Sequence, residues 1–177
     1  METAIAALII ITLTLFGVLT LAHGYLSVQY QNLQAWRAME ERIGERARTN
    51  LLPLSAVALD GGSVVEVTVK NVGSARLTDF AQWDLIVEYE AVAAHIVQWY
   101  PYVATAEPGP NQWTVKGIYL DATQAIPEAC EPGILNPGEE LVAEVRISPP
   151  IADGTTGFAN ISTPNGIQAS AVVVASQ

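Results

Sequence analysis

The chain has 177 residues, a length that suits one ordinary domain and an appendage. Eighteen acidic and eight basic residues give it a net charge of −10. An acidic excess of this size repels phosphate backbones, so nucleic acid is not expected as a partner. The charge is unevenly placed: residues 1–50 carry four acids and four bases, whereas residues 51–177 carry fourteen acids and four bases.

The N-terminal segment is apolar, and residues 3–22 form a run without any charge. A helix of about 20 apolar residues matches the hydrocarbon thickness of a bilayer. The polar side chains in this run are threonines, whose hydroxyls are expected to bond a carbonyl one turn earlier. No basic segment of the secretory type precedes the run, so we expect an uncleaved anchor or a mature chain whose leader has been removed. The residues expected to form a membrane helix or filament core are Ile5, Leu8, Ile9, Leu13, Phe16 and Leu19.

The same helix is expected to continue to about Thr49. Between Leu26 and Ala47, apolar residues recur every three or four positions and polar residues lie between them, as in an amphipathic helix. Asn50 and Pro53 are expected to end it, because proline cannot continue a helix. The apolar stripe of this segment consists of Leu26, Tyr30, Leu33, Trp36, Met39 and Ile43.

Beyond Pro53 the hydrophobic period changes to two, which indicates strands with one buried face. Turn signals rich in Gly, Pro and Asn separate these segments. About eight short strands without a second helix predict an immunoglobulin-like antiparallel β-sandwich. The expected fold class is therefore α+β, with a long N-terminal apolar α-helix in residues 1–50 and the sandwich in residues 54–177. The expected strands lie at 55–59, 65–70, 83–89, 94–100, 112–120, 141–147, 157–162 and 167–173.

No pattern in the chain indicates catalysis. The two histidines, His23 and His95, are far apart in sequence, Cys130 is the single cysteine, and the common nucleophile, zinc and nucleotide motifs are absent. We therefore expect no enzymatic activity, no metal and no cofactor. The triplet Asn-Ile-Ser that begins at Asn160 matches the N-glycosylation acceptor pattern, so a glycan is predicted there.

Three segments of the strand region carry a resemblance to a known family. Residues 67–73, Val-Thr-Val-Lys-Asn-Val-Gly, run on to Phe80, to Trp83-Asp84 and to Val87. This order is similar to the strand, Asn-x-Gly turn and Trp-Asp strand of archaellum sandwich proteins, and residues 135–140 and 163–167 are similar to their late-strand segments. Together with the helix, the chain resembles the type IV filament superfamily, and more closely its archaellum branch.

The resemblance implies an archaellin-like subunit of an extracellular filament for motility or adhesion. Such a subunit assembles with copies of itself through its N-terminal helices, and it sits in the cytoplasmic membrane before the filament's assembly platform and motor take it up. The family also contains accessory sandwich proteins. The alternative is therefore a membrane-anchored stator protein whose β-sandwich binds a cell-envelope partner.

Overall fold

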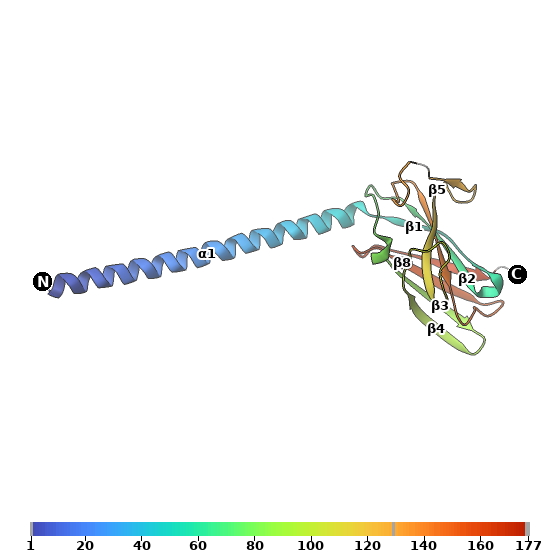
Figure 1. Cartoon of the computed structure of the whole chain (residues 1–177), viewed down its shortest axis with the longest axis horizontal. Coiled ribbons are helices and arrows are strands. Elements are labelled where there is room, and N and C mark those ends of the chain that lie inside the picture. The colour runs from blue at the N-terminus through green and yellow to red at the C-terminus, as the bar shows by residue number, and fades with distance from the viewer. Residues whose placement is uncertain (1, 129, 176–177) are drawn as a thin grey trace. The chain divides into compact units, whose positions relative to one another are not determined.

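Figure 1 shows the computed structural model, which describes residues 2–128 and 130–175. The chain divides into two compact units, one that extends to Gly44 and one that begins at Glu45. The first is a helix, and the second contains the strands together with the last helical turn.

The helix α1 spans Glu2–Arg48. No proline interrupts it, and it ends within one residue of the expected position. Thr49 ends it by donating both its backbone N–H and its hydroxyl to the Glu45 carbonyl, at 3.0 and 2.9 Å. The expectation that Pro53 helps to end the helix is wrong, because Pro53 already lies in the first strand, opposite Val69. Pro53 is tolerated there because the pairing shifts register beside it.

The described residues after the helix form nine strands, which include all eight expected ones. The additional strand, β6, has only two residues, too few to show a hydrophobic period. Short 3-10 turns, η1 (Asp60–Gly62) and η2 (Phe80–Gln82), lie between strands. The strands are β1 (Leu51–Leu59), β2 (Val64–Asn71), β3 (Asp84–Ala91), β4 (Ala94–Tyr100), β5 (Gln112–Asp121), β6 (Ile126–Pro127), β7 (Glu140–Arg146), β8 (Thr156–Ser162) and β9 (Gln168–Ala175).

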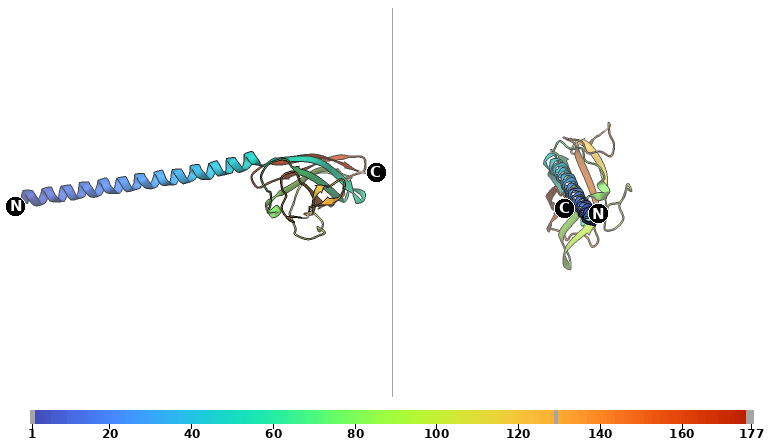
Figure 2. Two further views of the ribbon diagram at one scale, coloured as in Figure 1. Left: turned by 90° about the horizontal axis from the view of Figure 1, so that it is seen from above. Right: turned by 90° about the vertical axis from the view of Figure 1, so that its left-hand side faces the viewer.

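The strands pair in the order β4-β3-β8-β9-β1-β2-β7-β5-β6. Every neighbouring pair is antiparallel except β1 and β9, which are parallel. The sheet is strongly curved, as Figure 2 shows. The chain just after β4 returns to β5, where Trp113 donates to the Pro101 carbonyl at 3.0 Å and accepts from Val103 at 2.8 Å. The strands therefore enclose one core, and the α+β fold with a β-sandwich is confirmed.

The inner faces of β2, β3, β7 and β9 are the ones that the alternating pattern predicts. Val65 and Val67 of β2, and Leu141 and Val145 of β7, are fully buried, while the residues between them are mostly more exposed. The inner side chains of both halves of the sheet join one apolar cluster with Trp113. Burial of this surface is the main stabilising term of the sandwich, because water is excluded from a continuous apolar core.

Candidate assembly surface

The apolar side chains in the first half of α1 are exposed along its length. The six residues predicted to form a membrane helix or filament core, Ile5, Leu8, Ile9, Leu13, Phe16 and Leu19, are 53–70% exposed. Within the described residues, this is the one helix long and apolar enough to cross a membrane, and none of its most apolar window is buried. A continuous apolar surface of this size is unstable in water, so lipid or other protein must cover it.

The threonines of this half are compatible with a dry environment. The Thr12 hydroxyl donates to the Leu8 carbonyl at 2.8 Å, and the Thr20 hydroxyl donates to the Phe16 carbonyl at 2.8 Å. Thr14 makes the same bond one turn back. The predicted back-bonding is thus confirmed at these three positions, and their hydroxyls need no water.

The second half of α1 is amphipathic and equally uncovered. The six stripe residues, Leu26, Tyr30, Leu33, Trp36, Met39 and Ile43, are 53–74% exposed. Residues three and four positions apart share one face of a helix, so these side chains form a continuous strip. The two halves of α1 together present one long exposed apolar surface.

The last turn of α1 is hydrogen-bonded to the turn that follows β2. The Arg48 carbonyl accepts from Ser74 at 2.8 Å and from Ala75 at 3.1 Å. The Asn50 carbonyl accepts from Val72 at 3.0 Å. These bonds satisfy carbonyls that the end of a helix otherwise leaves without partners.

The side chains of Asn71 and Asn165 stabilise this contact between the end of α1 and the turn after β2. The buried Asn71 amide donates to Ala75 at 2.8 Å and to Leu135 at 3.0 Å, and its oxygen accepts from Gly73 at 3.0 Å. Asn165 donates to the buried Thr49 hydroxyl at 2.8 Å. The sequence of residues 67–73 and 163–167 indicated only a resemblance to segments of archaellum sandwich proteins. What it did not show is that two turns far apart in the chain both act on the end of α1.

Glycine is required at position 73 because there is no room for a side chain between the turn after β2 and the end of α1. A Cβ on Gly73 would come within 2.6 Å of the Asn50 nitrogen and closer still to the Arg48 carbonyl oxygen. Any side chain at position 73 would therefore push the end of the helix away from the β2 turn.

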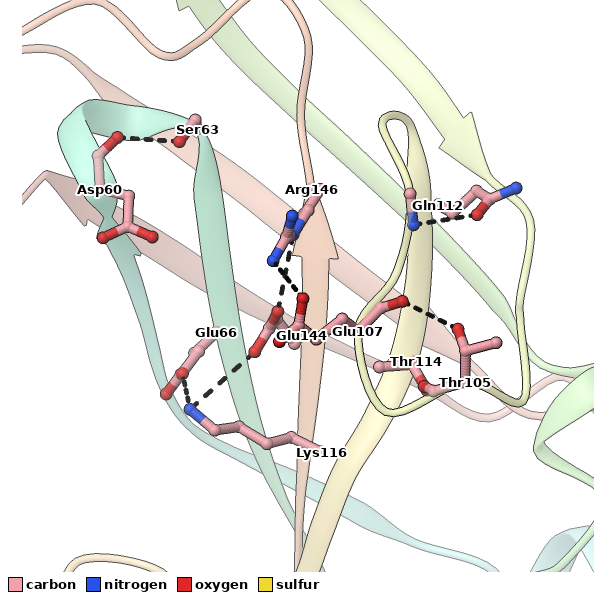
Figure 3. Close-up of polar contacts among 11 residues, drawn as sticks. Asp60, Ser63, Glu66, Thr105, Glu107, Gln112, Thr114, Lys116, Glu144 and Arg146 are labelled. Atoms are coloured by element: carbon pink, nitrogen blue, oxygen red, sulfur yellow. Dashed lines mark hydrogen bonds and ion pairs between the residues drawn. The ribbon is translucent and has the colours of Figure 1, made fainter.

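The basic residues of the sandwich are all paired within it. Lys70 pairs with Glu140 at 3.1 Å, and Arg76 pairs with Glu131. Lys116 pairs with Glu66 and lies 3.9 Å from Glu144, and Arg146 reaches Glu107 at 3.5 Å, as Figure 3 shows. The hydrogen bond that Lys116 donates to the Glu66 carboxylate raises the pKa of Lys116.

The basic residues of α1 differ in this respect. Among the described residues, none of the four arginines of α1 forms an ion pair, and all four are exposed. They are Arg37, Arg42, Arg46 and Arg48. The arginines of the helix are therefore the cations that a second molecule would meet.

The residues considered for chemistry do not form a reactive site. His95 is exposed on β4, with Nδ1 at 2.7 Å from Glu90 and Nε2 at 3.3 Å from Glu88. His23 is exposed on α1, and Cys130 is exposed in a loop. In the described part of the chain, no group of three or more His, Cys, Asp or Glu is arranged to hold a metal ion.

Asn160, the predicted glycosylation site, lies in β8 between two other strands. It is opposite Ile86 of β3 and Ser170 of β9. It is half-buried, and its side-chain oxygen has no hydrogen-bond partner in the part of the chain that the structure describes. A glycan at Asn160 stays a prediction.

No protein-family model matches the chain, and no curated protein matches it. Solved structures do match. The archaeal flagellum of Methanospirillum hungatei strain JF1 is similar over 97% of this chain and 92% of its own, with 13% identity and a TM-score of 0.59. The archaellum periplasmic stator protein FlaG from Sulfolobus acidocaldarius is similar over 70% of this chain and 98% of its own, with 19% identity and a TM-score of 0.50.

The complex of the stator proteins FlaF and FlaG from the same organism also matches, over 70% of this chain and 88% of that one, with 19% identity and a TM-score of 0.50. The structural neighbours are thus archaellum proteins, as the sequence resemblance indicated. At these identities the likeness establishes the fold, which this chain shares with both a filament protein and stator proteins.

Proposed function

We propose that this chain is a structural subunit of an archaellum-like, type IV pilus-like extracellular filament that serves motility or adhesion. Residues 1–50 form the filament core, and residues 54–177 form the outer surface. The subunit is inserted in the cytoplasmic membrane before an assembly platform and motor transfer it to the filament. Copies of the chain are its main partners.

The observation that carries this proposal is the complete exposure of a charge-free apolar segment. Within the described residues, none of the most apolar window of α1 is buried, yet Thr12 and Thr20 already bond carbonyls of their own helix. An extracellular filament contains no lipid, so copies of the same helix must replace it through close packing of small and branched side chains. The likeness to the flagellum of Methanospirillum hungatei supports this proposal, because it extends over nearly the whole chain, helix included.

We infer further that the chain is not an enzyme and uses no cofactor. The solved structures that it resembles are structural components of archaella, and the assembly surface needs no chemistry beyond packing and charge. The acidic sandwich keeps crowded copies soluble at the surface of a polymer.

The alternative function is a membrane-anchored stator or accessory protein whose sandwich binds a cell-envelope partner. The observation that favours it is the likeness to the periplasmic stator protein FlaG, which covers 70% of this chain and almost all of FlaG. In that case residues 3–22 remain in lipid, and no polymer forms.

Cysteine crosslinking separates the two functions. In a Cys130→Ser background, Ala7→Cys and Leu15→Cys together place thiols on the apolar helix. A filament subunit gives crosslinked ladders of many copies, and negative-stain microscopy of the same sample shows filaments. A pattern that stops at a dimer, without filaments, contradicts the filament function and favours the stator.

A further inference from the structure

The two edges of the sheet differ in how they are covered. At one edge, β6 has only two residues, one of them Pro127, and the segment 101–103 pairs with β5 where Tyr102 meets Trp113. At the other edge, β4 pairs with β3 along all seven of its residues, and no other described strand pairs with it. Figure 1 shows β4 at the margin of the strand unit. In the described part of the chain, β4 is therefore the one long edge strand.

β4 has none of the features that normally protect an edge strand. Proteins block such edges with lysine, with proline, with a bulge or with a very short strand. β4 contains no lysine, arginine or proline, and its register with β3 has no shift. Its outer side chains Val97 and Trp99 are 61% and 53% exposed. An unprotected apolar edge of this length is a position at which another strand adds to the sheet.

The hairpin between β3 and β4 determines which backbone groups of β4 point outward. Ala91 and Ala94 pair across the two-residue turn 92–93, and such a turn is closed by a pair that exchanges its hydrogen bonds. Hydrogen-bonded and non-hydrogen-bonded pairs then alternate along the antiparallel ladder. The backbone N–H and C=O groups of His95, Val97 and Trp99 therefore face away from β3.

A second copy of β4 can satisfy these outward groups. An added strand needs a free edge of its own, and every described strand except β4 and the two-residue β6 already has a neighbour on both sides. When two antiparallel copies of β4 overlap over their full length, Val97 lies opposite itself and His95 lies opposite Trp99. Both members of each such pair have outward N–H and C=O groups, so all the outward groups of both strands gain partners.

Like charges do not oppose this pairing. β4 has no acidic residue, and its His95 lies between two acids of β3, with Nδ1 at 2.7 Å from Glu90 and Nε2 at 3.3 Å from Glu88. In the joined sheet, the β3 strands of the two copies are three strand spacings apart, or about 14 Å. This distance exceeds the Debye length of about 8 Å at physiological ionic strength, so the acids of the two copies are screened from each other.

We propose that β4 pairs antiparallel with β4 of a second copy of this chain, in the register centred on Val97. The two sheets become one continuous sheet, and Val97 and Trp99 of each copy lie beside Val97 and His95 of the other. The contact is isologous, because both copies use the same edge, and it closes at two copies. It goes beyond the proposed function, because it uses the strand unit and not α1.

Disulfide trapping of the full-length chain in detergent tests the contact. In a Cys130→Ser background, Val97→Cys places two thiols in a hydrogen-bonded pair, whose Cα atoms are about 5.5 Å apart, a distance that a disulfide spans. We expect a covalent dimer to form about tenfold faster than with Val92→Cys, because pairing raises the local thiol concentration. Val92, which is 92% exposed, is the matched control at the tip of the same hairpin. Equal rates for the two variants overturn the proposal.

A mixture of two variants tests the register separately. Chains with His95→Cys and chains with Trp99→Cys, distinguished by tags of different mass, should form a mixed dimer. Neither variant should crosslink to itself, because the two copies of each position are about 14 Å apart in the proposed register. Self-crosslinking as fast as the mixed reaction overturns the register centred on Val97.

Lysine substitutions distinguish edge pairing from a contact between sheet faces. Val97→Lys in both chains puts like charges directly opposite each other, so it should lower the mixed trapping to the rate of the Val92→Cys control. Val172→Lys is the matched control, because Val172 is 49% exposed on the outer face of β9. It should leave the trapping unchanged, and equal urea midpoints show that both variants are folded. Loss of trapping with both variants indicates a face contact and overturns edge pairing, as does loss with neither.

Two further observations separate this contact from the filament function. Leu13→Arg on the apolar helix should leave the Val97→Cys dimer unchanged, and loss of the dimer overturns the claim that the strands pair without α1. Filaments without Val97 trapping overturn the strand pairing and leave the filament function intact. Trapping without filaments supports the pairing and contradicts the filament function.

Discussion

At the scale of single residues, the buried tyrosines Tyr89 of β3 and Tyr100 of β4 differ in the hydrogen bonding of their hydroxyls. The Tyr89 hydroxyl donates to the Pro149 carbonyl at 2.9 Å. The nearby Tyr100 hydroxyl is buried and has no partner of normal hydrogen-bond geometry among the described residues. Burial raises the pKa of both hydroxyls above the ordinary value, and most for Tyr100.

Tyr100→Phe should therefore change the response to alkali. Above about pH 10 the unfolded chain loses a tyrosine proton that the folded chain keeps, so the free energy of unfolding is full below that pH and falls above it. Removing the Tyr100 hydroxyl should lessen this fall and should raise stability at neutral pH by up to about 1 kcal/mol. Urea unfolding near neutral pH and above pH 10 measures both effects. Tyr30→Phe, on the exposed helix, is the control and should change neither.

Gly73→Ala should weaken the hydrogen bonds between the last turn of α1 and the turn after β2. The new Cβ meets backbone atoms of Arg48 and Asn50 that cannot move without breaking the bonds to the β2 turn. We expect a loss of about 1–3 kcal/mol in chemical unfolding. Gly109→Ala is the matched control, because its Cβ meets only the movable end of Gln112. Equal stability of the two variants would contradict the role given to Gly73.

At the scale of elements, α1 and the strands differ in whether their apolar side chains are buried within the chain. Each long strand has one apolar face, and the fold covers it within the same chain. The helix has exposed apolar side chains around its whole N-terminal half. It therefore depends on lipid or on other copies, which links the helix to location and assembly rather than to the stability of the sandwich.

Leu13→Arg should abolish assembly and leave the sandwich folded. A buried arginine at the centre of an apolar helix costs about 2.5–3.5 kcal/mol, which corresponds to roughly a hundredfold in an equilibrium constant. Filament yield by sedimentation and microscopy measures assembly, and the unfolding transition of the strand unit measures folding. Leu13→Met preserves volume and polarity and should assemble normally. If both variants assemble alike, the helix is not the core of the polymer.

At the scale of the whole molecule, the unit from Glu45 onwards has its own core and its own hydrogen bonds. Its first strand begins at Leu51, which is buried and pairs with Asn71. A fragment that begins at residue 54 therefore lacks part of β1 and the carbonyl of Asn50 that the β2 turn requires.

Two fragments test this boundary. Residues 45–177 should unfold in a single cooperative transition, because they retain the last helical turn and all of β1. Residues 54–177 should be less stable by about 3 kcal/mol, because they lose the buried Leu51 and three or more backbone hydrogen bonds. Urea titration of both, followed by tryptophan fluorescence, measures the difference. Equal midpoints would show that the segment 45–53 contributes nothing to the sandwich.

The sequence by itself determined the element types and most of their faces. The change from a period near 3.5 to a period of two is a local property, so it located α1, eight of the nine strands and their inner residues, such as Val67 and Leu141. The absence of charge in residues 3–22 likewise indicated an assembly surface without any knowledge of the fold.

Only the tertiary structure decided which distant residues act together. Asn165 and Thr49 meet although 116 positions separate them, and the parallel pairing of β1 with β9 joins the two ends of the strand unit. The pairing of Lys116 with Glu66, and the position of Trp99 and Phe158 on the same outer face of the sheet, also depend on strand order. The physical reason is that periodicity specifies which side of a strand is buried, whereas the choice of its neighbours depends on the packing of the whole core.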